Sequence, residues 1–226
     1  MNVKTPKETL QFFLNWTLAG TGIIPVSYMV SLIAVLLVHG AFGFSQTDPG
    51  THLSQTLMQV AGGSVIGLGT GMYQKDFLRK RFKVRTSWIY FPVIGFAVTE
   101  LVACLILWAL DMDRYKLRFI EGNPLPEALI FACAGMVTGI LQVSILKKHF
   151  AKSGYWIIAS TLGWGICILT NLLWFVPVVR SSIFFVILVF AMGAMFYGII
   201  TGFTLTRVLK PLNESLVEKA DTAPHL

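Results

Sequence analysis

The chain has 226 residues, of which 55% are apolar and only 13% are charged, and its mean hydropathy is +0.70. A soluble domain usually carries about a quarter charged residues, so this composition argues against a soluble globular domain and excludes a disordered chain. The formal net charge is +7. Because the positive charges fall in short segments between apolar runs, orientation in a membrane explains them better than nucleic-acid binding does.

The three cysteines and four histidines do not form a ligand pattern. Cys104, Cys133 and Cys167 all lie inside apolar runs and have no paired spacing, which is typical of small buried side chains rather than of a disulfide framework or a zinc site. The histidines are scattered along the chain. We therefore expect no metal site and no bound cofactor.

Six apolar stretches are each long enough to cross a bilayer as a helix, for which about 20 residues are needed. In chain order they cover residues 16–40, which follow an amphipathic lead-in from Thr5, and then 54–73, 88–110, 125–146, 155–178 and 182–205. The sequence thus predicts an all-α, polytopic membrane protein. Residues 1–210 would form a single six-helix transmembrane domain, and residues 211–226 a short polar cytoplasmic tail.

Lysine and arginine are distributed unevenly between the two sides of these spans. Fourteen of the 18 lie in the N-terminal segment, the second and fourth loops and the C-terminal segment, which six crossings would put on one side. Under the positive-inside rule that side is the cytoplasm, so we expect both termini there and the protein in a bacterial inner membrane. The basic residues that are candidates for contact with anionic lipid headgroups or a partner protein are Arg79, Lys80, Arg81, Lys83, Arg85, Lys147 and Lys148.

A sequence repeat relates the second and third spans to the fourth and fifth. The pattern G-x-x-x-G-x-x-Q-x-x-x-L, followed by two basic residues, begins at Gly67 and again at Gly135. Residues 67–101 and 135–169 share 11 identities over 35 positions without a gap, which is more than unrelated apolar helices would share. A partial third copy begins at Gly198 and has leucine at the glutamine position. Such self-similarity indicates a repeat architecture.

Each repeat unit corresponds to a helical hairpin, in which one helix begins near a tryptophan and the next carries the glycines back to a basic end. The hairpins are predicted at residues 10–82, 83–150 and 151–210. Because a hairpin returns to its starting side, they should be parallel repeats about an axis along the membrane normal. The pattern, with Trp-Ile at residues 88–89 and 156–157, resembles that of bacterial multi-pass membrane proteins with G-x-x-x-G-x-x-Q-x-x-x-L-K/R repeats. The resemblance implies a membrane architecture and assigns no activity.

Small residues follow one face of three predicted helices. Glycine there lets another backbone approach closely, and helix association in lipid depends on such packing. The three faces are either packing seams alone or the lining of a shared vestibule. Their glycines are Gly63, Gly67, Gly71, Gly135, Gly139, Gly198 and Gly202.

Four polar residues within the spans are candidates for binding a ligand or a proton. Gln74 and Gln142 share the glycine face, where a carboxamide can bond a neighbouring helix or hold a lipid headgroup or a polar substrate. Glu100 lies about 18 Å along its helix from Trp88, at 1.5 Å per residue, and an ionisable group at that depth is costly and often functional. Asn171, on the fifth span, is a candidate partner of Glu100.

The chain contains no nucleophile elbow, zinc-protease motif, Walker loop or dinucleotide fingerprint. The preferred interpretation is therefore a non-enzymatic module that binds a lipid or small ligand, or a membrane subunit of a larger complex. A proton-coupled carrier or channel that uses Glu100 is one alternative, and a lipid-modifying enzyme is another. The expected partners are the bilayer, its anionic headgroups and a second copy or a membrane protein, and not nucleic acid.

Overall fold

The computed structural model describes residues 5–42, 51–80, 84–110, 125–170 and 183–211. The α-helices of these residues are α1 (Pro6–Phe42), α2 (Thr51–Leu78), α3 (Ser87–Ala109), α4 (Leu125–Leu146), α5 (Tyr155–Leu169) and α7 (Ile183–Phe203). A π-helix, η3 (Thr204–Val208), continues α7. Two strands of two residues each, β1 (Phe150–Ala151) and β2 (Lys210–Pro211), pair antiparallel. The described chain is thus almost entirely helical.

Four helices among the described residues are long and apolar enough to cross a membrane: α1, α3, α4 and the continuous helix formed by α7 and η3. They indicate a multi-pass membrane protein. Helix α2 is not among them, because serine, threonine, glutamine and glycine residues interrupt its apolar residues. Helix α5 has 15 residues, and the remainder of the predicted fifth span lies outside the described part of the chain. Helix α4 has the same bounds as the predicted span 125–146.

The start of α1 explains why the amphipathic lead-in belongs to the same helix as the first span. The Thr5 N–H donates to Glu8 Oε2 over 3.0 Å, and the Glu8 N–H donates to Thr5 Oγ1 over 3.3 Å, which together form a capping box. Pro6 occupies the first helical position, where no N–H is needed. Helix α1 therefore runs from Pro6 to Phe42, with Pro25 inside it.

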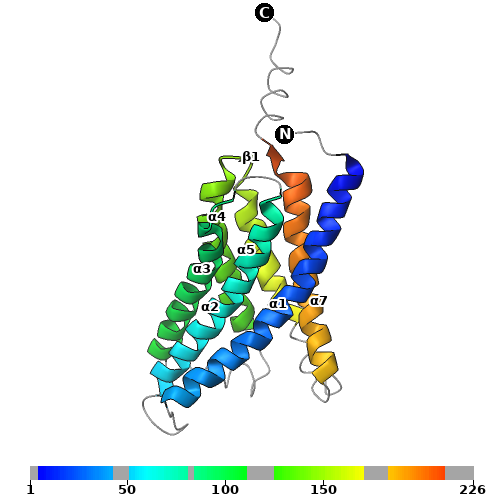
Figure 1. Ribbon diagram of the computed structural model, residues 1–226. Helices are drawn as coiled ribbons and strands as arrows, with labels where there is room; N and C mark the ends of the chain where they lie inside the picture. Colours follow the sequence, from blue (N-terminus) through cyan, green and yellow to red (C-terminus); the bar gives the residue numbers. More distant parts are fainter. Residues whose placement is uncertain (1–4, 43–50, 81–83, 111–124, 171–182, 212–226) are drawn as a thin grey trace, which may run out of the picture.

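The helices form a closed ring. Along the chain, each helix packs against the next in the order α1, α2, α3, α4, α5 and α7, and α7 packs against α1. Figure 1 shows the first turns of α1 and the last turns of α7 at the same end of the bundle, beside β1. At this end the β1–β2 pair joins the α4–α5 connection to the segment after η3.

One group of aromatic side chains fills the interior of the ring. Phe96 of α3 lies 5.4 Å from Phe131 of α4 and 4.8 Å from Trp164 of α5, measured between ring centroids. Trp164 in turn lies 4.8 Å from Tyr197 of α7. We call these four residues the aromatic cluster. Its members come from four helices, so side chains rather than an open conduit occupy this level of the ring.

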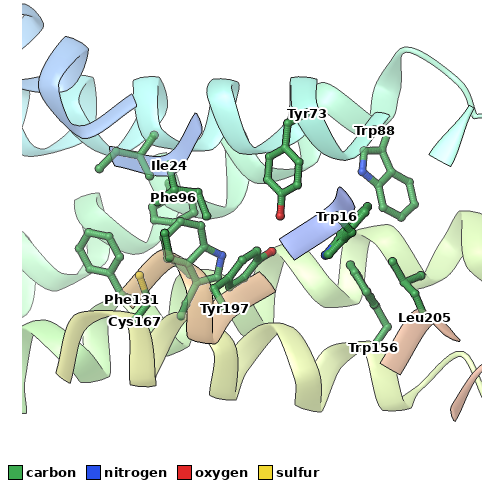
Figure 2. Packing of buried hydrophobic residues seen from close by; sticks show 14 of the residues in the cluster. Trp16, Ile24, Tyr73, Trp88, Phe96, Phe131, Trp156, Cys167, Tyr197 and Leu205 are labelled. Carbon is green, nitrogen blue, oxygen red and sulfur yellow. The ribbon is translucent and has the colours of Figure 1, made fainter. Parts of the chain in front are cut away.

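A second group lies nearer the end that carries β1. Trp16, Trp88 and Trp156 are fully buried, and the Trp156 ring lies 6.4 Å from each of the other two. We call these residues the tryptophan cluster. Figure 2 shows Phe96, Phe131 and Tyr197 of the aromatic cluster separated along the bundle from the tryptophan cluster, with the side chain of Tyr73 between the two groups.

Candidate functional site

The glycines of α2 face the backbone of α3. A Cβ atom added at Gly67 would lie 2.6 Å from the Pro92 carbonyl oxygen, and one added at Gly71 would lie 2.6 Å from the Ile89 carbonyl oxygen. Distances this short leave no room for a side chain, so both glycines are needed for the close approach of the two helices.

The corresponding glycines of α4 face α5, and those of α7 face α1. A Cβ atom at Gly139 would lie 2.9 Å from Ile157 Cα, and one at Gly198 would lie 2.9 Å from Thr17 Cα. The remaining contacts pair Gly135 with Ser160 and Gly202 with Trp16. In every case the glycine contacts the next helix of the ring, as a packing seam does, and not an opening at the centre.

Gln74 is the hub of a buried hydrogen-bond network between five helices. Its Oε1 accepts from the Trp88 Nε1–H over 3.1 Å and from the Gln142 Nε2–H over 2.9 Å, and its Nε2–H donates to the Tyr197 hydroxyl over 2.7 Å. Gln142 Oε1 accepts from the Trp156 Nε1–H over 2.6 Å. Both glutamine side chains are fully buried, so the network joins α2, α3, α4, α5 and α7 inside the ring.

The network uses most of the hydrogen-bonding capacity of the two glutamines. Both lone-pair directions of the Gln74 oxygen are taken, and each amide nitrogen retains one N–H beyond the bonds described above. A lipid headgroup could reach these groups only if the network opened. The geometry therefore favours a role in helix association, in which each bond contributes about 0.6 kcal/mol on average.

The seam between α7 and α1 has a different hydrogen bond. Leu205 stands at the glutamine position and offers no side-chain acceptor. The Trp16 Nε1–H instead donates to Thr201 Oγ1 over 3.0 Å, and the Thr201 hydroxyl donates to the Tyr197 carbonyl oxygen over 2.7 Å. Through this bond the sixth helix, α1, also takes part in the buried side-chain hydrogen bonds. We call the network and this bond together the buried polar layer.

The predicted motif omits a threonine that all three copies share. Thr70, Thr138 and Thr201 each precede the second glycine, giving G-x-x-T-G three times, and all three side chains are at most 1% exposed. This pattern is visible in the sequence and identifies the third copy more clearly than the glutamine position does.

Glu100 is 2% exposed and lies beside α2. A Cβ atom at Gly63 would lie 2.9 Å from Glu100 Cγ, so this glycine makes room for the glutamate. Asn171, its predicted partner, lies outside the described residues. Glu127, in the first turn of α4, is a second buried carboxyl at 6% exposure. The prediction omits it because it lies at the edge of its span.

Basic side chains gather at the β1 end of the bundle, where α1, α3 and α5 begin and α2, α4 and η3 end. Two acidic residues of the described chain lie at this end, Glu8 and Asp76, and Asp76 pairs with Arg79 over 3.4 Å. Arg81 and Lys83 lie outside the described residues. At the opposite end, the described residues include no lysine or arginine. The basic residues whose side chains the structure describes are Lys7, Lys75, Arg79, Lys80, Arg85, Lys147, Lys148, Lys152 and Arg207.

Within the described ranges, no group of three His, Cys, Asp or Glu side chains is placed to hold a metal ion. No family model, curated protein or solved structure matches the chain.

Proposed function

We propose that this protein crosses the inner membrane six times as three parallel hairpins, with both termini in the cytoplasm, and that its basic end binds anionic lipid headgroups. The closed order of helix packing supports the hairpin arrangement, since each glycine-bearing helix contacts the tryptophan-led helix that follows it in the ring. The contacts α2–α3 and α4–α5 are the first two such pairs. The contact of α7 with α1 is the third, and it joins the last helix to the first.

The observation that carries the lipid-binding proposal is the charge of the β1 end. Nine described basic side chains and two acidic ones lie there, and apart from half-buried Lys75 the basic side chains are exposed. A basic residue near an anionic membrane surface contributes about 1 kcal/mol to attraction. A cluster of this size on one end of a bundle with an apolar outer surface favours the headgroups of the adjoining leaflet as the ligand.

Aromatic packing gives this end a defined rim. The Lys80 ammonium lies 5.1 Å from the centre of the Phe77 ring, and Phe77 packs edge-on against Phe12 at 6.3 Å and Trp16 at 6.1 Å. This cation–π contact keeps the Lys80 charge close to the level where the helices leave the bilayer. The phosphate of a lipid headgroup at that depth would contact Lys80, and the acyl chains of the lipid would lie along the apolar surface beside it.

Competition between lipids in mixed detergent micelles tests the proposal. Phosphatidylglycerol should displace a fluorescent phosphatidylglycerol from the purified protein, and phosphatidylcholine should not. Removing two charges with Lys147→Gln and Lys148→Gln should weaken phosphatidylglycerol binding about tenfold or more, since each charge contributes about 1 kcal/mol.

The matched control keeps the charge and changes the side chain. Lys147→Arg with Lys148→Arg should bind phosphatidylglycerol as the unaltered protein does. Equal binding of phosphatidylglycerol and phosphatidylcholine, or the same affinity after both charges are removed, would contradict the proposal.

A proton-coupled carrier is the second candidate, and buried Glu100 is the observation that favours it. Glu100→Gln should then abolish proton-coupled flux in proteoliposomes, because an amide cannot exchange a proton, while the protein accumulates in the membrane normally. Failure of the variant to accumulate would instead make Glu100 a structural residue. The aromatic cluster argues against this candidate, since a transport path would have to pass the side chains that fill the ring. A lipid-modifying enzyme has no specific observation in its favour.

A further inference from the structure

Two short strands join the segment after the last helix to the connection between α4 and α5. Ala151 of β1 pairs with Lys210 of β2, and Phe150 pairs with Pro211. We call these four residues the clasp. A two-stranded pairing on its own is only marginally stable, and Pro211 has no N–H with which to extend it. Interactions beyond the two residue pairs therefore decide whether the clasp stays closed.

One part of the clasp belongs to the buried core. Phe150 is 6% exposed and Leu209, directly before β2, is 4% exposed. Both lie in the same core cluster as Leu146 and Leu205. This burial favours closure, and the closed clasp fixes where the segment after η3 lies.

The last helix departs from regular α-helical geometry directly before the clasp. In η3 the Leu209 N–H donates to the Thr204 carbonyl oxygen over 2.9 Å, which is the bond pattern of a π-helix. The hydroxyls of Thr204 and Thr206 donate to the carbonyl oxygens of Ile200 and Gly202, and bonds of this kind bend helices. The path of the last helix is therefore easiest to change at the end that the clasp holds.

The two segments that the clasp joins carry like charges. No acidic residue lies within residues 146–156 or 204–211, which contain β1 and β2. The lysines of the first segment are exposed, and so is the arginine of the second. The basic residues are Lys147, Lys148 and Lys152 in the first segment and Arg207 and Lys210 in the second.

Closing the clasp brings these basic segments close together. Paired Cα atoms of an antiparallel ladder lie about 4.5–5.5 Å apart, and consecutive Cα atoms of a chain lie about 3.8 Å apart. Because Ala151 pairs with Lys210, the Cα atoms of Lys152 and Lys210 lie within about 9 Å of each other, close to one Debye length at physiological ionic strength. Like charges at this separation repel, so an anion bound between the two segments stabilises the closed clasp.

The backbone of Lys152 gives independent support for a bound anion. Its φ is 59°, in the left-handed region that is unfavourable for residues other than glycine, asparagine and aspartate. The side chain is exposed, and its ammonium group forms no ion pair with any residue that the structure describes. A ligand contact made by the ammonium group accounts for a lysine where glycine would be unstrained.

We propose that the clasp is a lipid-dependent latch. An anionic headgroup bound between the two basic segments stabilises the closed form, which holds the end of the last helix beside the α4–α5 connection. This inference rests on the proposed binding of anionic headgroups at the basic end and adds a conformational consequence to it. A ligand that binds the closed form more tightly shifts the population toward closure, and closure strengthens binding by the same factor.

Amide hydrogen exchange of the full chain in lipid nanodiscs tests the latch. Because Pro211 has no N–H, the ladder bonds of the clasp belong to the Ala151–Lys210 pair, and exchange at these two amides reports opening. Both should exchange at least about fivefold more slowly in phosphatidylglycerol discs than in phosphatidylcholine discs, which is the effect of one basic residue near an anionic surface. Inorganic phosphate added to phosphatidylcholine discs should not slow them.

Lys152→Asn separates the charge from the backbone conformation. Asparagine is neutral and tolerates the left-handed region, so the clasp should form in both kinds of disc, but the difference in exchange between them should fall to about twofold or less. Lys152→Arg keeps the charge and should keep the full difference. Comparing the variants in the same discs holds the pH at the anionic surface constant, so a change in local pH does not imitate the result.

Three results would overturn the latch. Equal exchange at Ala151 and Lys210 in both kinds of disc would do so, and lipid binding would still hold if phosphatidylglycerol continued to displace its fluorescent analogue. A full difference in Lys152→Asn would assign the slower exchange to the lipid surface in general. An equal effect of inorganic phosphate would assign the site to a free anion. If phosphatidylglycerol does not bind at all, the lipid-binding proposal fails together with the latch.

Discussion

Gln74 and Gln142 occupy equivalent positions of the sequence repeat but make different numbers of hydrogen bonds. Gln74 bonds with three side chains and Gln142 with two. Replacing Gln74 leaves the Trp88 N–H and the Gln142 amide N–H without an acceptor. Replacing Gln142 leaves only the Trp156 N–H without one. The repeat therefore predicts the positions and not their unequal importance.

Gln74→Leu should destabilise the protein more than Gln142→Leu. We expect a loss of about 2–4 kcal/mol in the free energy of unfolding for Gln74→Leu and about half of that for Gln142→Leu, because fewer buried groups lose their partner. Unfolding in a denaturing detergent, followed by tryptophan fluorescence, measures both.

The control is Gln59→Leu, the same substitution on the same helix at a half-buried position outside the network. It should change the free energy of unfolding by less than about 0.5 kcal/mol. Equal losses for Gln74→Leu and Gln59→Leu would show that the network does not stabilise the ring.

At the scale of the helices, the close approach of α2 to α3 depends on Gly71. Gly71→Ala should destabilise the protein by about 1–3 kcal/mol, because its Cβ would lie 2.6 Å from the Ile89 carbonyl oxygen and the helices would have to separate. The same unfolding assay measures the effect.

Gly22→Ala is the matched control within α1. No atom lies within 4 Å of a Cβ atom added at Gly22, so alanine should be neutral or should stabilise the helix by up to about 1 kcal/mol. If Gly71→Ala were as well tolerated as Gly22→Ala, the α2–α3 seam would be looser than the structure describes.

The sequence predicts helices well where a span is uniformly apolar. The bounds predicted for α4 agree at both ends, and those for α3 agree within one residue. The length of α1 is underestimated because its first turns are amphipathic and the capping box at Thr5 and Glu8 is not part of a hydropathy signal. Helix α2 extends beyond the predicted span 54–73 at both ends, and it is not among the four apolar helices because its glycines and polar residues, which face neighbouring helices, lower its average hydropathy.

The buried polar layer is harder to predict than the helices. Periodicity puts Gln74 on the glycine face, but it cannot pair Gln74 with Tyr197, because these residues lie 123 positions apart and meet only when the ring closes. The same holds for Trp16 and Thr201, whose bond spans 185 positions. Pairings of this kind depend on the order of the helices around the ring, which local sequence does not encode.

At the scale of the whole molecule, the contact between the first and last helices completes the ring. Trp16 and Thr17 of α1 face the glycines of α7, as the tryptophan-led ends of α3 and α5 face those of α2 and α4. Two seams join consecutive helices of the chain and the third joins its ends. In the structure the three glycine-bearing helices α2, α4 and α7 all run toward the β1 end of the bundle, as the proposed parallel hairpins require.

Cysteine accessibility in whole bacterial cells tests this arrangement most directly. Single cysteines at Arg85, Lys152, Ala41 or Leu125, in a chain whose native cysteines are replaced by alanine, are treated with a membrane-impermeant maleimide. We expect Ala41→Cys and Leu125→Cys to react in intact cells, and Arg85→Cys and Lys152→Cys to react only after the membrane is opened. Reaction of Arg85→Cys and Lys152→Cys from opposite sides would contradict the parallel hairpins, because the second hairpin would then fail to return to its starting side.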